Sequence, residues 1–286
     1  MSVKNKTGYI DAKRVYGTQM VNGLSLTGTK QEYDEVSAIQ NLTLGSALKV
    51  DERVYHYARA GGALVAPCTY RLQVNGDIQS PVTWGMALAA PGIALGASSC
   101  NVTHGNYGLP VATSVAANEL VGGWIEIWGA ANAFMWRRIT SNTASVLGNP
   151  ATLTITVDRP FNIAVVAGAG VVALHRNDYF NVVMGGSVPA IVGYESAVGI
   201  TPIPVPINNF FWLQTFGPCF IASQLGNPGA VINFRDVYYG AAGTIIDKLA
   251  AEGAGANIGP QRIGYISGAS TNGDGNNDVN LQLAPF

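Results

Sequence analysis

Glycine and proline interrupt this chain so often that it has little room for long helices. The 286 residues include 35 glycines and 14 prolines, and both are spread along the whole length. Such punctuation is typical of many short strands joined by turns. We therefore predict an all-β fold, mainly an antiparallel sandwich or barrel-like body, with few short helices and an extended N-terminal arm.

Several runs have the alternation expected of strands. The clearest is Thr152–Val157, in which apolar residues alternate with threonines, as in a strand that buries one face. Trp124–Trp128 places two tryptophans on one face and two isoleucines on the other, so we expect both faces to be partly covered. Three β-branched or aromatic runs are also predicted to be strands: Phe161–Ala167, Val171–Leu174 and Tyr179–Met184.

Helix signals are few, and the best of them is Thr244–Glu252. Thr244 is a suitable N-cap, Asp247 lies in the first turn, and Gly253 follows the end. Lys30–Ile39 carries large residues at three-residue spacing, which fits either a helix or an extended arm.

The polarity of the chain changes near residue 50. Residues 1–50 predict an extended N-terminal arm, and residues 51–286 predict a β-rich body, with the turn-rich stretch 141–150 as the candidate boundary between two subdomains. The first 40 residues have too little apolar surface to fold alone, yet they contain spaced large side chains. We therefore predict that the arm lies on a neighbouring subunit or shell. The alternative is an arm folded back on its own body.

Charged residues make up only 12% of the chain, about half the usual share for a soluble globular protein. The net charge is −1 and no block of Lys and Arg occurs, so we expect no direct contact with nucleic acid and none with an anionic membrane. A chain this poor in charge is expected to bury much of its outside against copies of itself or another protein. A compact monomer with an uncharged polar surface is the alternative.

Three cysteines, Cys68, Cys100 and Cys219, lie far apart in the sequence. The odd, low count argues against a disulfide scaffold, and we expect reduced, mostly buried thiols made in a cytoplasm. The first residues lack the apolar core of a signal peptide, and no apolar run reaches the length of a membrane span.

Three short patterns resemble ligand sites, but each has a plainer interpretation. Gly168–Gly170 resembles a dinucleotide fingerprint, yet β-branched residues follow where a helix should hold the pyrophosphate, so we interpret it as a turn. Cys100 and His104 have a spacing usable by zinc, without two further ligands nearby. Asp274–Asp278 alternates acids and amides as in a calcium loop, but no distal glutamate follows.

No catalytic constellation stands out. The histidines His56, His104 and His175 each fit a polar position in a strand or turn, and no G-x-S-x-G elbow occurs. Most acidic residues lie beside basic or polar ones rather than in pairs suited to glycosidase chemistry. We predict no catalytic residues, no cofactor-binding residues, no metal ligands and no enzyme activity.

The run FFWLQTFGPC at residues 210–219 carries large aromatic side chains at both odd and even positions. In an extended strand both faces would then be apolar, and neither should be left to water. We interpret this run as a central core strand. The alternative is a strand with one face against a neighbouring subunit.

This run also resembles the FWLQTxGPC signature of a family of tailed-bacteriophage structural proteins, typically encoded near the major capsid protein. A second stretch, GSALKVDERVYHYARAGG at Gly45–Gly62, is similar to a segment near the N-terminus of that family. The third is QRIGYI at Gln261–Ile266, followed by a Gly/Asp loop and a short strand. The order of the motifs is preserved, whereas residues 75–150 match nothing in the family.

The resemblance implies a virion component of the phage head, non-enzymatic and made in the bacterial host cytoplasm. The leading interpretation is a capsid decoration or cement protein that binds the major capsid protein and stabilises the shell as a homo-oligomer, expected as a homotrimer. One alternative is the major capsid protein itself, which needs a long spine helix that no window of this sequence offers. The other is a receptor-binding or spike protein, which would want a cleft with clustered acids and aromatics.

Overall fold

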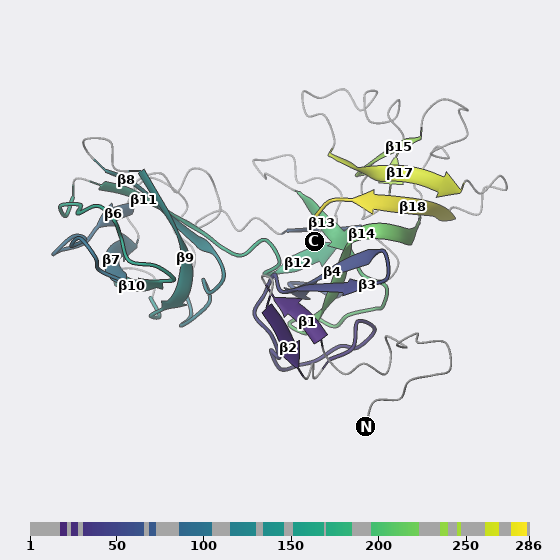
Figure 1. The fold of residues 1–286 in the computed structure, drawn as a ribbon, viewed down its shortest axis with the longest axis horizontal. Helices are drawn as coiled ribbons and strands as arrows, with labels where there is room; N and C mark the ends of the chain where they lie inside the picture. The colour runs from purple at the N-terminus through teal and green to yellow at the C-terminus, as the bar shows by residue number, and fades with distance from the viewer. Residues whose placement is uncertain are drawn as a thin grey trace. The chain divides into compact units, whose positions relative to one another are not determined.

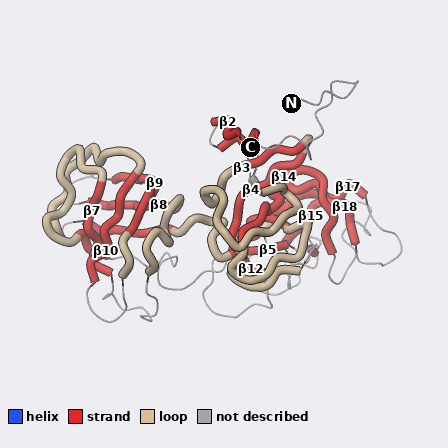
Figure 2. Tube along the Cα trace, turned by 90° about the horizontal axis from the view of Figure 1, so that it is seen from below, coloured by secondary structure: helices blue, strands red, loops and turns tan. Residues whose placement is uncertain are grey.

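The computed structural model describes residues 18–21, 24–27, 31–65, 69–72, 86–104, 115–129, 134–145, 151–168, 170–184, 196–222, 235–239, 245–246, 261–268 and 276–284. All regular elements within these ranges are β-strands, and Figure 2 shows only strands and loops. The predicted all-β fold is thereby confirmed. The chain divides into two compact units, a barrel unit spanning Val74–Asp178 and a sheet unit formed by the chain on either side of it.

The sheet unit contains twelve of the described strands (Figure 1). They are β1 (Thr18–Val21), β2 (Leu24–Thr27), β3 (Ala47–Val50), β4 (Arg53–Arg59), β5 (Thr69–Leu72), β12 (Val182–Met184), β13 (Ala197–Ile200), β14 (Phe210–Ala222), β15 (Asp236–Tyr239), β16 (Ile245–Ile246), β17 (Arg262–Gly268) and β18 (Asn276–Gln282). Strands β1 and β2 form a separate antiparallel hairpin, and the other ten belong to one sheet in the order β12-β5-β13-β14-β18-β17-β15-β16, with β4 and β3 added at β14.

Strand β14 is the centre of this sheet because it has neighbours along both edges. Its first half pairs with β4, in register from Phe210 opposite Arg59, and its second half pairs with β18. Gln214 is opposite Ile200 of β13 as well as a residue of β4, so β13 and β4 lie on opposite edges. Every ladder along β14 is antiparallel.

Both faces of β14 are buried from Phe210 to Thr215. Phe210 and Trp212 pack in one apolar cluster with Tyr57 of β4, while Phe211 and Leu213 pack in a second cluster on the other face. The interpretation of this run as a central core strand is therefore right, and the chain itself covers the face that the alternative assigned to a neighbouring subunit.

The segment before β3 is fixed to the sheet by a buried amide. Gln31, 2% exposed, donates from Nε2 to the carbonyl of Phe210 at 2.9 Å and accepts from the Tyr57 hydroxyl at 2.8 Å. Its own carbonyl accepts from Trp212 Nε1 at 3.2 Å, and Asn41 Nδ2 donates to its side-chain oxygen at 3.2 Å. Because each of these buried polar groups has a partner, the segment can lie over the aromatic cluster without an unpaired amide.

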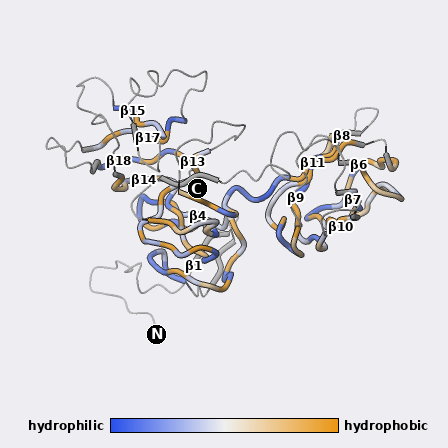
Figure 3. The backbone as a smooth tube through the Cα atoms, turned by 180° about the vertical axis from the view of Figure 1, so that it is seen from behind, coloured by the Kyte–Doolittle hydropathy of each residue, from blue (hydrophilic) through white to orange (hydrophobic). Residues whose placement is uncertain are grey.

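The barrel unit is a closed six-stranded antiparallel barrel (Figure 1). Its strands are β6 (Met86–Leu88), β7 (Ser99–His104), β8 (Trp124–Gly129), β9 (Phe134–Asn142), β10 (Ala151–Val157) and β11 (Gly170–His175), in the order β10-β7-β6-β11-β8-β9 with β9 closing onto β10. Hydrophobic stretches run along these strands (Figure 3), and their inward residues form one core. Each of the six described strands has a neighbour on both sides, although β6 pairs with only Val171 and Val172 of β11.

The alternation in Thr152–Val157 is confirmed by β10. Leu153, Ile155 and Val157 point into the core, and the threonines between them lie outside. Strand β8 buries Ile125 and Ile127 in the same core. Side chains alternate between the two faces of a strand, so every second residue of these sequences fills the barrel.

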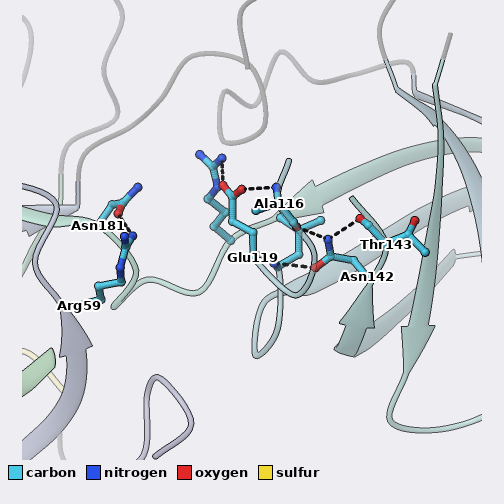
Figure 4. Close-up of polar contacts among 8 residues, drawn as sticks. Arg59, Ala116, Glu119, Asn142, Thr143 and Asn181 are labelled. Carbon is cyan, nitrogen blue, oxygen red and sulfur yellow. Dashed lines mark hydrogen bonds and ion pairs between the residues drawn. The ribbon is translucent and has the colours of Figure 1, made fainter. Parts of the chain in front are cut away.

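Polar side chains stabilise the loop between Val115 and Gly123 in the barrel unit through hydrogen bonds (Figure 4). Asn142 accepts from the Leu120 amide at 2.9 Å and donates to the Ala116 carbonyl at 2.8 Å. Glu119 accepts from the Ala116 amide at 2.7 Å and forms an ion pair with buried Arg176. These bonds hold Leu120 in the core of the barrel.

The barrel unit is inserted between two paired strands of the sheet unit. Strand β5 leads into it and β12 follows it, and Leu72 pairs with Val182. The returning chain is fixed by Arg59, whose amide donates to the Tyr179 carbonyl at 2.9 Å and whose guanidinium donates to Asn181 Oδ1 at 2.6 Å (Figure 4). An insertion whose two ends are adjacent strands costs the sheet little in loop-closure entropy.

Two predicted elements are wrong. Phe161–Ala167 is a loop with one bridge, from Val165 to Ile93; Phe161 and Val165 lie in the barrel core without forming a strand, whereas Val166 is exposed. Within the predicted helix Thr244–Glu252, Ile245–Ile246 forms β16 and pairs with β15. Strand pairing of both residues and burial of Ile245 override the local helix signal. Thr244 and residues 247–252 lie outside the described ranges.

The predicted domain boundaries also differ from those found. Residues 31–50 pack on the sheet unit and include β3, so this part of the expected arm is folded back on its own body, whereas β1 and β2 form their own hairpin. Lys30–Ile39 contains a turn and a bridge from Ser37 to Phe210 rather than a helix. The body does divide into two units, but at residues 73/74 and 178/179; position 141 lies within β9, well inside the barrel unit.

Two glycines of one barrel loop provide a matched test of packing. Gly92 and Gly96 have φ values of +89° and +83°, but a Cβ on Gly92 would lie 2.4 Å from the Val165 carbonyl oxygen, whereas a Cβ on Gly96 meets nothing within 4 Å. We predict that Gly96→Ala costs about 1 kcal/mol, the conformational term alone, and Gly92→Ala about 3 kcal/mol or more. Thermal unfolding of the two variants measures the difference. Equal losses of stability in the two variants would contradict the close approach of Gly92 to the Val165 carbonyl.

The insertion predicts that the two units fold independently, because each has its own core. Replacing residues 74–178 by a short Gly/Ser linker should leave a sheet unit that unfolds cooperatively, since Leu72 and Val182 remain paired. The excised residues 74–178 should also fold as a β-protein. Circular dichroism and thermal unfolding of both pieces are the measurements. Loss of cooperative unfolding in either piece would show that its core depends on the other.

Candidate interaction surface

The histidines named from the sequence do not share a site. His56 lies on β4 in the sheet unit, and His104 and His175 lie on β7 and β11 in the barrel unit. Of His104, only the backbone is described. The three histidines therefore occupy separate positions in the fold.

His56 has a structural environment. Its ring stacks on Tyr179 at 4.8 Å between centroids, and its Nδ1 lies 2.9 Å from the Thr215 hydroxyl oxygen. Thr215 donates its single hydroxyl proton to the Ala284 carbonyl at 2.8 Å, so its oxygen can accept from the Nδ1–H of a neutral imidazole. Burial lowers the pKa of His56 to about 4. The neutral ring therefore joins β4, β14 and the C-terminal segment.

The two cysteines that can be described are both unpaired thiols. Cys100 points into the barrel core, and burial raises its pKa to about 12. Cys219 Sγ lies 3.3 Å from the Val279 carbonyl oxygen, and burial raises its pKa further still. A thiol held protonated in this way is a poor nucleophile and a poor metal ligand.

The patterns that resembled ligand sites fall on strands or outside the described ranges. Cys100 and His104 are both on β7, where a four-residue step is about 13 Å, too far for one ion to bridge. Gly170 opens strand β11, so the fingerprint lacks the helix that holds a pyrophosphate. Asp274 is outside the described ranges, and β18 begins at Asn276. Among the residues that can be described, no three His, Cys, Asp or Glu side chains gather as a metal site.

The most distinctive surface is the outer side of β8, β9 and β11 in the barrel unit. Because the neighbouring residues of these strands point into the core, nine positions face outward in three cross-strand rows. The rows are Phe134–Trp128–Val171, Trp136–Glu126–Ala173 and Arg138–Trp124–His175. We call these nine residues the aromatic face.

The rings of this face form one continuous chain of contacts. Trp128 and Phe134 lie 6.4 Å apart between centroids, Phe134 and Trp136 6.2 Å, and Trp136 and Trp124 6.4 Å. Trp124 is 39% exposed, Trp136 41% and Phe134 55%. Large aromatic side chains exposed together in this way mark a binding surface more often than isolated apolar residues do.

Charged groups lie among the rings rather than only around them. Glu126, at the centre of the face, is 7% exposed, and its Oε2 lies 3.2 Å from His175 Nε2. The His175 ring stacks on Trp136 at 5.6 Å, and the Arg138 guanidinium lies 6.0 Å from the centre of the Trp124 ring. The face therefore offers flat apolar rings together with a carboxylate, an imidazole and a guanidinium.

The prediction that both faces of Trp124–Trp128 are partly covered is confirmed, because Ile125 and Ile127 are buried and Trp124 is 39% exposed. The other half of the signal is Phe134 and Trp136 on the next strand, which is not among the strands predicted from the sequence. Two successive strands with aromatics at every second position, joined by a turn, would have indicated one aromatic surface.

Comparison with protein-family models, with curated proteins and with solved structures finds no match to this chain. No helix long and apolar enough to cross a membrane occurs in the part of the chain that the structure describes.

The depressed pKa of His56 predicts a pH-dependent stability. An unfolded histidine takes up a proton near pH 6.5, whereas His56 in the folded chain does so only near pH 4. The unfolded state therefore binds more protons in this interval, and the free energy of unfolding falls as the pH is lowered from 6.5 to about 4.

His56→Gln removes this titration, so its stability should fall less than that of the native chain over the same interval. Urea unfolding at pH 7.0, 5.5 and 4.5 measures both proteins. Parallel pH profiles would mean that His56 titrates normally in the folded state.

Proposed function

We propose that this chain is a non-enzymatic structural component of a tailed-phage particle, a capsid decoration or cement protein. Its partners are the major capsid protein and further copies of itself, as a homo-oligomer and most simply a trimer. It acts by burying surface between capsomers of the head shell, so its energetics are those of an interface.

The observation that carries this proposal is the assembly of the three family-like stretches in one sheet. Gly45–Gly62 contains β3 and β4, FFWLQTFGPC forms most of β14, and QRIGYI belongs to β17. Strand β4 pairs directly with β14, and β17 is joined to it through β18. Residues from distant parts of the sequence that resemble one family thus build one continuous sheet, as a shared folding unit requires.

The unmatched middle of the chain supports the same proposal. Residues 75–150 fall within the barrel unit, which is inserted between β5 and β12 without interrupting the ladders of β14. A family-like sheet unit that carries a separate inserted barrel accounts for a resemblance that stops at residue 75 and resumes later in the chain. Low charge is consistent with a protein that buries much of its surface in an assembly.

A receptor-binding or spike protein is the second candidate, and the aromatic face favours it. Such a protein is expected to have clustered aromatics and acids, and this face supplies the exposed rings of Trp124 and Trp136, whereas its one carboxylate, Glu126, is only 7% exposed. The major capsid protein is disfavoured, because a long spine helix is absent from the ranges that the structure describes.

Copy number in the particle distinguishes these functions. Quantitative mass spectrometry of purified particles of the phage that encodes the chain should find it at a level comparable to, and not above, that of the shell protein. Heads assembled without it should rupture at lower temperature and regain stability when the purified chain is added. A handful of copies per particle would favour the spike, and absence from particles would overturn both.

A further inference from the structure

The aromatic face has a composition that limits what can bind it. Its ionisable side chains are one carboxylate, Glu126, one guanidinium, Arg138, and one imidazole, His175, so no cluster of basic groups lies on it. A nucleic-acid strand or an anionic membrane needs a basic surface to offset phosphate charge. Both are therefore poor occupants.

A flat apolar protein surface is a poor occupant as well. Covering the face would remove water from the side chains of Arg138 and His175, and burying such groups without further hydrogen-bonding partners costs free energy. The occupant must therefore have apolar patches and hydrogen-bonding groups side by side.

A sugar ring has this combination. One face of a pyranose presents C–H groups that pack on an aromatic ring, and hydroxyls around its edge both donate and accept hydrogen bonds. On the aromatic face, Trp136 and Trp124 supply exposed rings, Glu126 supplies an acceptor next to them, and Arg138 supplies donors. An uncharged, hydroxyl-rich ligand also suits a face whose carboxylate and guanidinium balance each other.

We propose that the aromatic face of the barrel unit binds a glycan. A sugar ring packs on Trp136, whose neighbours Trp124 and Phe134 are turned 64° and 62° to it at 6.4 and 6.2 Å between centroids and contact the sugar from its sides, and hydroxyls bond to Glu126 and Arg138. The buried Glu126, held by His175, is a positioning and hydrogen-bonding group, and no bond is made or broken. This binding does not depend on whether the sheet unit attaches to a capsid.

The test uses the full chain on an array printed with bacterial surface polysaccharides and with hexose and hexosamine oligomers. We expect the native chain to bind a subset of these glycans, and Trp136→Ala to weaken that binding by about tenfold or more, as for truncation of an aromatic residue at the centre of a binding surface. Trp136→Phe should restore part of the loss. Thr152→Ala, on the outer side of β10, is the matched control and should bind as the native chain does.

A second variant, Glu126→Gln, separates loss of binding from loss of fold, because it keeps the shape of the side chain and removes its charge. It should weaken binding to the same glycans without lowering the melting temperature of the barrel unit. No binding of the native chain to any printed glycan, or unchanged binding by folded Trp136→Ala and Glu126→Gln, would overturn the proposal. Loss of attachment to phage heads by these variants, with no glycan binding by the native chain, would instead make the face a shell contact.

Discussion

Strand β14 has neighbours along both edges and buried side chains on both faces, and this constraint organises the sheet unit. One face is covered by the aromatic rings of β4 and by the segment that contains Gln31. The other face is covered by the apolar cluster around Phe211. Its edges pair with β4, β13 and β18, which come from three separate parts of the sequence. A strand covered this completely cannot also serve as a contact for another subunit along Phe210–Thr215.

The same constraint explains where an extra module can be accommodated. Insertions within the ladders of β14 would interrupt its pairing, whereas β5 and β12 lie at the far side of the sheet order and pair with each other. The barrel enters between them, with its own core of inward residues from six strands. Its aromatic face, which shares no residue with the sheet unit, can evolve binding properties without altering the packing of β14.

Local pattern predicted the strands well but predicted pairing and exposure poorly. Alternation in Thr152–Val157 and aromatics on both sides of Phe210–Thr215 report burial directly, so both predictions were right. Ile245–Ile246 carries a helix-like pattern but pairs with β15, and that partner is not visible in the local sequence. The aromatic face depends on the register between β8 and β9, which places Trp136 opposite Glu126 and cannot be read from either strand alone.

Native-state hydrogen exchange in increasing denaturant is the most direct measurement of whether this is a sheet unit organised by β14 with an independent inserted barrel. The account predicts two opening reactions. Amides of β14, β4 and β18 should share one free energy and one denaturant dependence, and amides of β7, β8 and β10 should share another. A single opening reaction common to all six strands would contradict it, because the two cores would then form one cooperative structure.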